Sequence, residues 1–311
     1  PDRAARSYEK ILEIDPENLR AAEALTPIYE GGRDASKLAN VYEVRLKHLE
    51  EPNARIAMLR EVGLLYEEKL RDPATAFERY LEAFSTGPTQ EIVREDVSRL
   101  AESVEGGWDR VIRVYQDAIE ASIDEDESLG LRMDFGGVLK NVGRIDEAIA
   151  QFRAVYDARP EHMGAVNALS ELYRMTERYG ELLEIYDARM EIETDLDARR
   201  QLAYGKASLY QDALGDANAA IEAYNSILAE YGDQEADAFR ALDALYEQQE
   251  RWEELADTIA RRVALAEDGQ EEASLRFRLG KVYESRLGRK ADAVELYRHV
   301  LTLLPEHDGG R

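Results

Sequence analysis

Residues 144–162 read RIDEAIAQFRAVYDARPEH. The apolar side chains of this stretch recur at the spacing of one stripe along an amphipathic helix: Ala148, Ile149, Phe152, Val155 and Tyr156. Pro160 follows the stripe, and proline cannot continue a helix because it lacks a backbone N–H and its ring clashes with the preceding turn. The stretch therefore predicts an amphipathic helix that ends before Pro160.

The same pattern returns at residues 289–307, RKADAVELYRHVLTLLPEH, which close on the same Pro-Glu-His. One large side chain in the middle of each such helix can be followed along the whole chain at intervals of 34 to 38 residues: Tyr8, Tyr42, Tyr80, Tyr115, Phe152, Tyr186, Tyr224, Ile259 and Tyr297. Another helical pattern and a turn signal, most often containing Gly or Pro, precede each of these except the first. The sequence predicts about 17 helices and no strand, because no long segment alternates with period two.

The intervals themselves repeat after four units, as 34, 38, 35, 37 and then 34, 38, 35, 38. A shift of 144 residues superposes Tyr42 on Tyr186 and Trp108 on Trp252. We therefore expect one domain over 1–311, made of two blocks of four helix pairs, approximately 16–160 and 161–307, after a lone helix at 3–15. Because the chain begins in the middle of a repeat, we expect it to be a fragment of a longer protein.

The charge of the chain limits the classes of partner. Asp and Glu number 65 against 40 Lys and Arg, a net charge of −25, which argues against binding nucleic acid or anionic membrane surfaces. The same excess also keeps a large helical surface soluble. No run of 18 apolar residues is present, so we expect no direct membrane insertion.

The sequence contains no recognisable motif for catalysis or metal binding. With no cysteine, thiol catalysis and cysteine-based metal sites are excluded, and the compartment stays open. The four histidines lack metal-ligand spacing, and no nucleophile elbow or phosphate loop occurs. The acidic run at 124–128 resembles the start of a calcium loop, but Leu129 and Phe135 stand where that loop needs Gly and Glu, so we expect a solvated loop that caps the next helix. The sequence predicts no enzyme, no cofactor and no metal.

Short motifs relate the pairs to a known family. Leu279-Gly280 with Tyr283 is followed by Ala293, Tyr297 and Pro305, and Phe135-Gly136 with Leu139 is followed by Ala148, Phe152 and Pro160. Val62-Gly63 with Tyr66 fits the same spacing to Ala76 and Tyr80 after one inserted residue. With these motifs the whole chain resembles tetratricopeptide-repeat proteins. The resemblance implies an all-α, right-handed superhelical solenoid of about eight helix pairs plus a leading helix.

In that family the first helix of each pair lines a concave groove that binds peptides. The groove positions of the family fall here on nine residues: Arg60, Lys140, Asn141, Asn167, Arg174, Tyr204, Arg240, Phe277 and Lys281. A groove with these cations would be less acidic than the rest of the chain and would suit a peptide with acidic and apolar residues. The alternative is that the cations pair with carboxylates on neighbouring helices, where each pair contributes little.

The resemblance implies a non-enzymatic scaffold that presents this groove to a protein or peptide partner. Two alternatives stay open: an architectural spacer or self-assembling section of a larger complex, and a regulatory module that senses a peptide. The leading helix lacks a partner for its outward apolar stripe, which includes some of Tyr8, Ile11, Leu12 and Ile14. We therefore expect that end to fray or to associate with another copy through the terminal helices.

Overall fold

The computed structural model describes residues 2–32 and 34–303. These residues form seventeen α-helices and two short π-helices, and no strand occurs among them, which confirms the predicted all-α fold. The chain divides into two compact units, unit 1 (Pro1–Leu169) and unit 2 (Ser170–Arg311). The repetition of a four-pair block stays a prediction from the sequence.

Unit 1 holds nine helices and the first π-helix: α1 (Asp2–Ile14), α2 (Leu19–Glu30), α3 (Ala35–Lys47), α4 (Pro52–Leu65), η1 (Tyr66–Leu70), α5 (Pro73–Thr86), α6 (Glu91–Ala101), α7 (Gly107–Ala121), α8 (Glu125–Asn141) and α9 (Ile145–Ala158). The boundary between the units falls within α10 (Met163–Met175). Unit 2 continues with α11 (Tyr179–Ile192), α12 (Leu196–Ser208), η2 (Leu209–Ala213), α13 (Ala217–Tyr231), α14 (Ala236–Gln248), α15 (Trp252–Leu265), α16 (Gly269–Ser285) and α17 (Lys290–Leu303).

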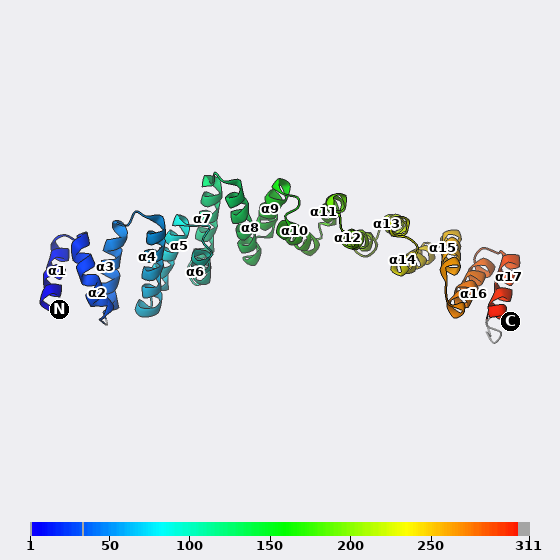
Figure 1. The fold of residues 1–311 in the computed structure, drawn as a ribbon, viewed down its shortest axis with the longest axis horizontal. Helices are drawn as coiled ribbons and strands as arrows, with labels where there is room; N and C mark the ends of the chain where they lie inside the picture. The colour runs from blue at the N-terminus through cyan, green and yellow to red at the C-terminus, as the bar shows by residue number, and fades with distance from the viewer. Residues whose placement is uncertain (1, 33, 304–311) are drawn as a thin grey trace. The chain divides into compact units, whose positions relative to one another are not determined.

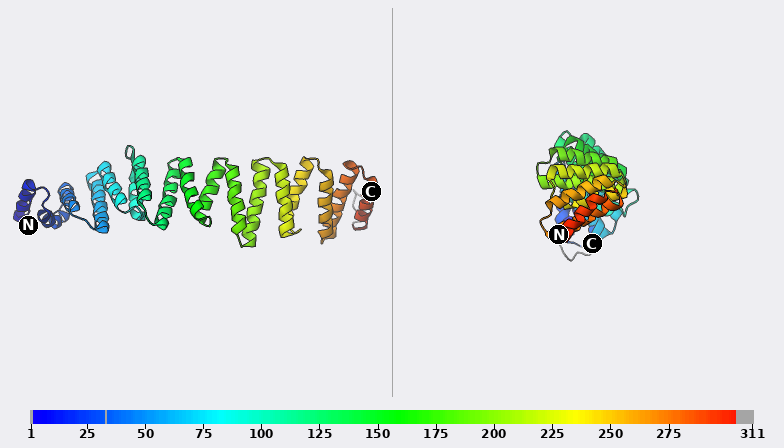
Figure 2. Two further views of the ribbon diagram at one scale, coloured as in Figure 1. Left: turned by 90° about the horizontal axis from the view of Figure 1, so that it is seen from above. Right: turned by 90° about the vertical axis from the view of Figure 1, so that its right-hand side faces the viewer.

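Within each unit, successive helices follow one another side by side in the order of the chain (Figures 1 and 2). The closest packing joins the two helices of a predicted pair, as in α4 with α5, α8 with α9 and α16 with α17. We call the even-numbered helices from α2 first helices and the odd-numbered helices from α3 second helices. This local packing is how repeats bury faces that a single pair would leave in water.

Glycines in the first helices explain how tightly the pairs close. A Cβ added to Gly136 would lie 2.7 Å from the ring of Phe152, and one added to Gly280 would lie 2.6 Å from the ring of Tyr297. A Cβ added to Gly63 would likewise lie 2.5 Å from the ring of Tyr80. The glycine therefore makes room for the aromatic ring of its partner helix.

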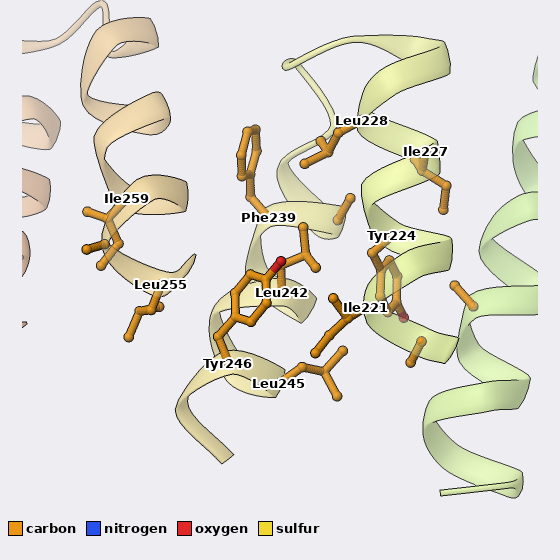
Figure 3. Packing of buried hydrophobic residues seen from close by; sticks show 14 of the residues in the cluster. Ile221, Tyr224, Ile227, Leu228, Phe239, Leu242, Leu245, Tyr246, Leu255 and Ile259 are labelled. Carbon is orange, nitrogen blue, oxygen red and sulfur yellow. The ribbon is translucent and has the colours of Figure 1, made fainter. Parts of the chain in front are cut away.

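The same tight packing continues through unit 2. Figure 3 shows side chains of α13, α14 and α15 gathering between these helices, with Ile221 and Tyr224 facing Leu242 and Leu245. Tyr224 is only 7% exposed, and Ala220, one helical turn before it, is fully buried. A small residue followed by a large ring is thus the packing unit that the sequence pattern predicted.

The turns from first to second helices share one backbone conformation. The residue before each N-cap is left-handed at six of these turns: Arg71, Gly143, Glu177, Gly215, Glu250 and Gly288, with φ between 55° and 80°. This is the usual helix C-terminus in which a later N–H returns to an earlier carbonyl. The backbone N–H of Arg144, for example, donates to the carbonyl of Leu139, five residues back, at 2.8 Å. All six turns lie between two of the predicted helical patterns, where the sequence analysis expected a turn.

The π-helices absorb an extra residue just before two of these turns. After η1 and η2 the returning bond reaches six residues back, from Asp72 to Tyr66 (2.9 Å) and from Asp216 to Tyr210 (2.8 Å). The inserted residue that the sequence showed before Ala76 therefore widens the end of the first helix, as single-turn π-bulges do.

Candidate functional site

Successive first helices of unit 1 touch through ion pairs. Arg60 of α4 meets Asp96 of α6, with 2.5 Å from Nε to Oδ2. Arg94 of α6 meets Asp134 of α8 at 3.2 Å. These contacts join helices one pair apart, so the first helices form a continuous surface in unit 1, which we call the first-helix face.

A hollow of about 280 Å³ lies on this face between α4 and α6. Arg60 and Asp96 line it together with Leu64, which is 47% exposed, and Tyr80 of α5. The Tyr80 hydroxyl donates to Glu67 at 3.0 Å. Burial, assisted by Glu67, raises the pKa of Tyr80 to about 12, so the hydroxyl stays a donor at neutral pH. The hollow thus sets a guanidinium and exposed apolar surface beside the carboxylates of Glu61 and Asp96.

Unit 2 has its own hollow, of about 330 Å³, against α10, α12 and η2. Arg174, Tyr179, Gly205 and Leu209 are among its lining residues. The Arg174 guanidinium donates to the hydroxyl of Tyr186, a neutral partner. No carboxylate pairs with Arg174 among the residues that the structure describes, so its positive charge is not neutralised.

The other predicted groove residues of unit 2 also lie on first helices. The Tyr204 hydroxyl donates to Glu235 at 2.9 Å, and burial raises the pKa of Tyr204 further than this hydrogen bond does. Arg240 pairs with Asp237 one turn away on α14, and both side chains are 72% exposed. The Lys281 ammonium lies 5.0 Å from the centre of the Phe277 ring.

The structure therefore places all nine predicted residues on first helices, but it brings few of them together. Arg60 lines the hollow of unit 1, Arg174 lines that of unit 2, and Lys281 and Phe277 touch each other. Lys140 and Asn141 lie at the end of α8 and Asn167 lies on α10, outside both hollows. Arg60 does have the ion pair on a neighbouring helix that the alternative interpretation expected. The groove assignment as a whole stays a prediction.

Several lining residues were not predicted. In unit 1 these include Tyr80 and Asp96, and in unit 2 Ser208 and Asp212, whose side chains bond each other at 2.8 Å. Tyr80 was recognised as a packing residue, and it is almost fully buried beneath the hollow of unit 1. For Asp212 the usable signal was the inserted residue that creates η2.

The histidines have structural roles where they are described. His162 accepts the N–H of Ala165 at 3.1 Å through Nδ1 and so caps the start of α10. His48 and His299 bond backbone carbonyls, of Glu17 (2.9 Å) and Glu295 (3.1 Å). His307 lies outside the described residues.

The described helices also bear on metal binding and on membrane insertion. Over residues 2–32 and 34–303, no group of three or more His, Cys, Asp or Glu side chains is placed to hold a metal ion. None of the helices described is both long enough and apolar enough to span a bilayer. The acidic loop does cap α8 as predicted, because Asp124 accepts the N–H of Glu127 at 2.9 Å.

The stacked antiparallel pairs with helix-lined hollows define an α-helical repeat protein. Residues 273–307, which include most of α16 and all of α17, match the family model described as "Tetratricopeptide repeat". This match and the helical pairs of the fold confirm the resemblance to tetratricopeptide-repeat proteins that the sequence predicted. None of the curated proteins is similar to the chain in sequence.

Several solved structures are similar to the chain. A tetratricopeptide repeat protein from Parabacteroides merdae is 15% identical, with a TM-score of 0.34 over 82% of this chain and 95% of that one. The C-terminal part of a TPR repeat-containing protein from Cytophaga hutchinsonii is 15% identical, with a TM-score of 0.34 over 94% and 98%. YrrB, described as a TPR protein with an unusual peptide-binding site, is 15% identical, with a TM-score of 0.33 over 63% and 95%.

Proposed function

We propose that this chain is a non-enzymatic scaffold that binds a protein partner through peptide segments held on its first-helix faces. The observation that carries the proposal is the pair of hollows, one in each unit, each of which sets an arginine beside apolar surface. A scaffold needs such sites on rigid elements, and helices locked by neighbouring pairs supply them.

The two arginines suggest what a bound segment would contain. Arg174 has a neutral hydrogen-bond partner, so a carboxylate from a peptide can pair with it without breaking an existing ion pair. Arg60 is already paired with Asp96, and a ligand there would have to share or displace that contact. Leu64 and the half-buried Tyr179 provide apolar surface next to each arginine. A segment that combines an acidic with an apolar side chain therefore fits the hollow at Arg174 best.

Selection from a random-peptide phage library against the whole chain tests this proposal. The selected peptides are synthesised with a fluorophore, and their affinities are measured by fluorescence anisotropy. The expected peptides are acidic and apolar, and Arg174→Glu should weaken them about tenfold or more, because a favourable charge contact becomes a repulsive one.

A matched pair of variants controls for net charge. Arg240 and Arg298 are both about 70% exposed, and each pairs with a carboxylate one turn earlier, but Arg240 lies on a first helix and Arg298 on a second helix. Arg240→Glu should weaken binding if the bound segment reaches that part of the face, whereas Arg298→Glu should not. Selection of no binding peptide, or equal affinities in Arg174→Glu and Arg298→Glu, would overturn the first-helix assignment.

A further inference from the structure

A second groove lies in unit 1, away from the first-helix face. It has a volume of about 560 Å³ and runs between the C-terminal ends of the second helices α5 and α7 and the loops that follow them. Ser85 and Pro88 line it from α5 and its loop, and Val114 and Ala118 line it from α7. The groove therefore crosses from one helix pair to the next, and none of its lining residues lines the hollow on the first-helix face.

Part of the lining is apolar and open to water. Pro88, Val114 and Ala118 are half-buried, and Ile123 in the loop after α7 is fully exposed, at 101%. An isoleucine held in water at the edge of an apolar groove gains hydrophobic free energy when a partner covers it. The groove thus has a site for an apolar side chain.

The charged residues that line this groove are all acidic. Asp117, Asp124 and Glu127 line the groove, and no Lys or Arg does. Among the residues that the structure describes, Asp117 and Glu127 have no basic partner. Neither α5 nor α7 has a basic residue in its last turn, so the partial negative charges at the two helix C-termini add to the carboxylates.

Both loops that border the groove are held in place. Arg94 donates to the carbonyls of Pro88 (3.2 Å) and Thr89 (2.7 Å). In the second loop the Ser122 hydroxyl donates to the Asp124 carbonyl at 3.0 Å, while the Asp124 side chain caps α8. A partner would therefore bind without first ordering these loops, which lowers the entropic cost of association.

We propose that this groove docks a short segment of a partner protein in which an apolar side chain is flanked by lysine or arginine. The apolar side chain lies against Val114 and Ile123, and the cations meet Asp117, Glu127 and the carbonyls at the helix ends. A phosphate-bearing partner does not fit, because it would face uncompensated carboxylates. The other large groove of unit 1, of about 530 Å³ and lined by residues of α1 and α3, already contains a cation, Lys37, paired with Glu9 at 2.6 Å.

The test measures binding of fluorescein-labelled synthetic peptides to the whole chain by anisotropy. One probe has the sequence Lys-Arg-Leu-Ile-Lys, a second replaces Leu-Ile by Ser-Ser, and a third replaces the three basic residues by Glu. The first probe should saturate at or below about 1 mM, the range of a weak docking contact. The second should bind about tenfold more weakly and the third should not bind. Raising NaCl from about 50 mM to about 500 mM should weaken the first probe, because exposed charge contacts are screened.

Matched variants assign the binding to the groove. Asp117→Lys and Ile123→Ser should each lower the affinity of the first probe about fivefold or more. Asp257→Lys makes the same charge change on α15, and Ile14→Ser removes another exposed isoleucine, and both should leave the affinity within twofold. Circular dichroism confirms that each variant is folded. No saturable binding of the first probe, equal binding of the second, or equal losses in Asp117→Lys and Asp257→Lys would each overturn the proposal.

Discussion

Replacing either of two adjacent glycines in α8 by alanine should have opposite effects on stability. A Cβ at Gly136 would lie 2.7 Å from the Phe152 ring, closer than real Cβ contacts, whereas a Cβ at Gly137 would meet nothing within 4 Å. Both positions gain about 1 kcal/mol of helix propensity when Gly becomes Ala. At Gly136 this gain is opposed by overpacking, which typically costs about 1–3 kcal/mol.

The propensity gain cancels when the two variants are compared with each other. Gly137→Ala should therefore exceed Gly136→Ala in unfolding free energy by about 1–3 kcal/mol, which isolates the overpacking cost. Hydrogen exchange of the α8 and α9 amides is the suitable assay, because repeat arrays need not unfold in a single step. Exchange in Gly136→Ala should be faster than in the unsubstituted chain, and in Gly137→Ala slower. Equal protection in the two variants would refute the close approach of Gly136 to Phe152 that explains the pairing of α8 and α9.

Other substitutions test the core, the turns and the ion pairs. Tyr224→Ala should destabilise unit 2 by about 3–5 kcal/mol in urea unfolding, because the ring is almost fully buried, and a loss below about 1 kcal/mol would contradict that packing. Glu250→Gly should raise the unfolding free energy by a few tenths to about 1 kcal/mol, because Glu250 has a φ of 55° that glycine adopts more easily. Gly215→Ala, at a φ of 64°, should lower the unfolding free energy by a similar amount. A change of the same sign in both variants would be inconsistent with left-handed turns. The hydrogen bond from Arg99 lowers the pKa of Glu67, so its contribution to stability is present above the unfolded-state pKa near 4 and is lost as the pH falls through the lower folded pKa. Urea midpoints between pH 5 and pH 2 should therefore fall less steeply in Glu67→Gln, and an unchanged slope would exclude this linkage.

The sequence was sufficient to predict the helices because the apolar stripes and stop residues that indicate a helix are local features. The stripe through Phe152 and the stop at Pro160 depend only on helical geometry, and α9 ends at Ala158, just before Pro160. The turns were equally readable where Gly143 and Gly215 take the left-handed conformation. At Glu177 the turn was recognised from its place between two helical patterns, since a glutamate carries no such signal.

The hollows could not be predicted in the same way, because their shape depends on contacts between repeats. Arg60 was selected by its position on a first helix, but its ion pair with Asp96 depends on how α6 lies beside α4. The insertion before Ala76 was visible as an extra residue, yet nothing in the sequence indicated that it forms a π-helix at the end of α4. Side chains 30 or more residues apart meet only through the stacking geometry.

The large acidic excess is therefore distributed unevenly over the surface of unit 1. On the first-helix face, arginines such as Arg60 and Arg94 neutralise carboxylates across neighbouring helices, so binding there must exploit or exchange existing pairs. In the groove between α5 and α7, Asp117 and Glu127 have no basic partner among the described residues, and two helix C-termini add to their field. Despite the net charge of −25, the two surfaces of unit 1 therefore differ in how strongly they repel anions and attract cations. We propose that acidic segments bind on the first-helix face and basic segments in the groove between α5 and α7, and the peptide selections and the synthetic probes measure these two preferences separately.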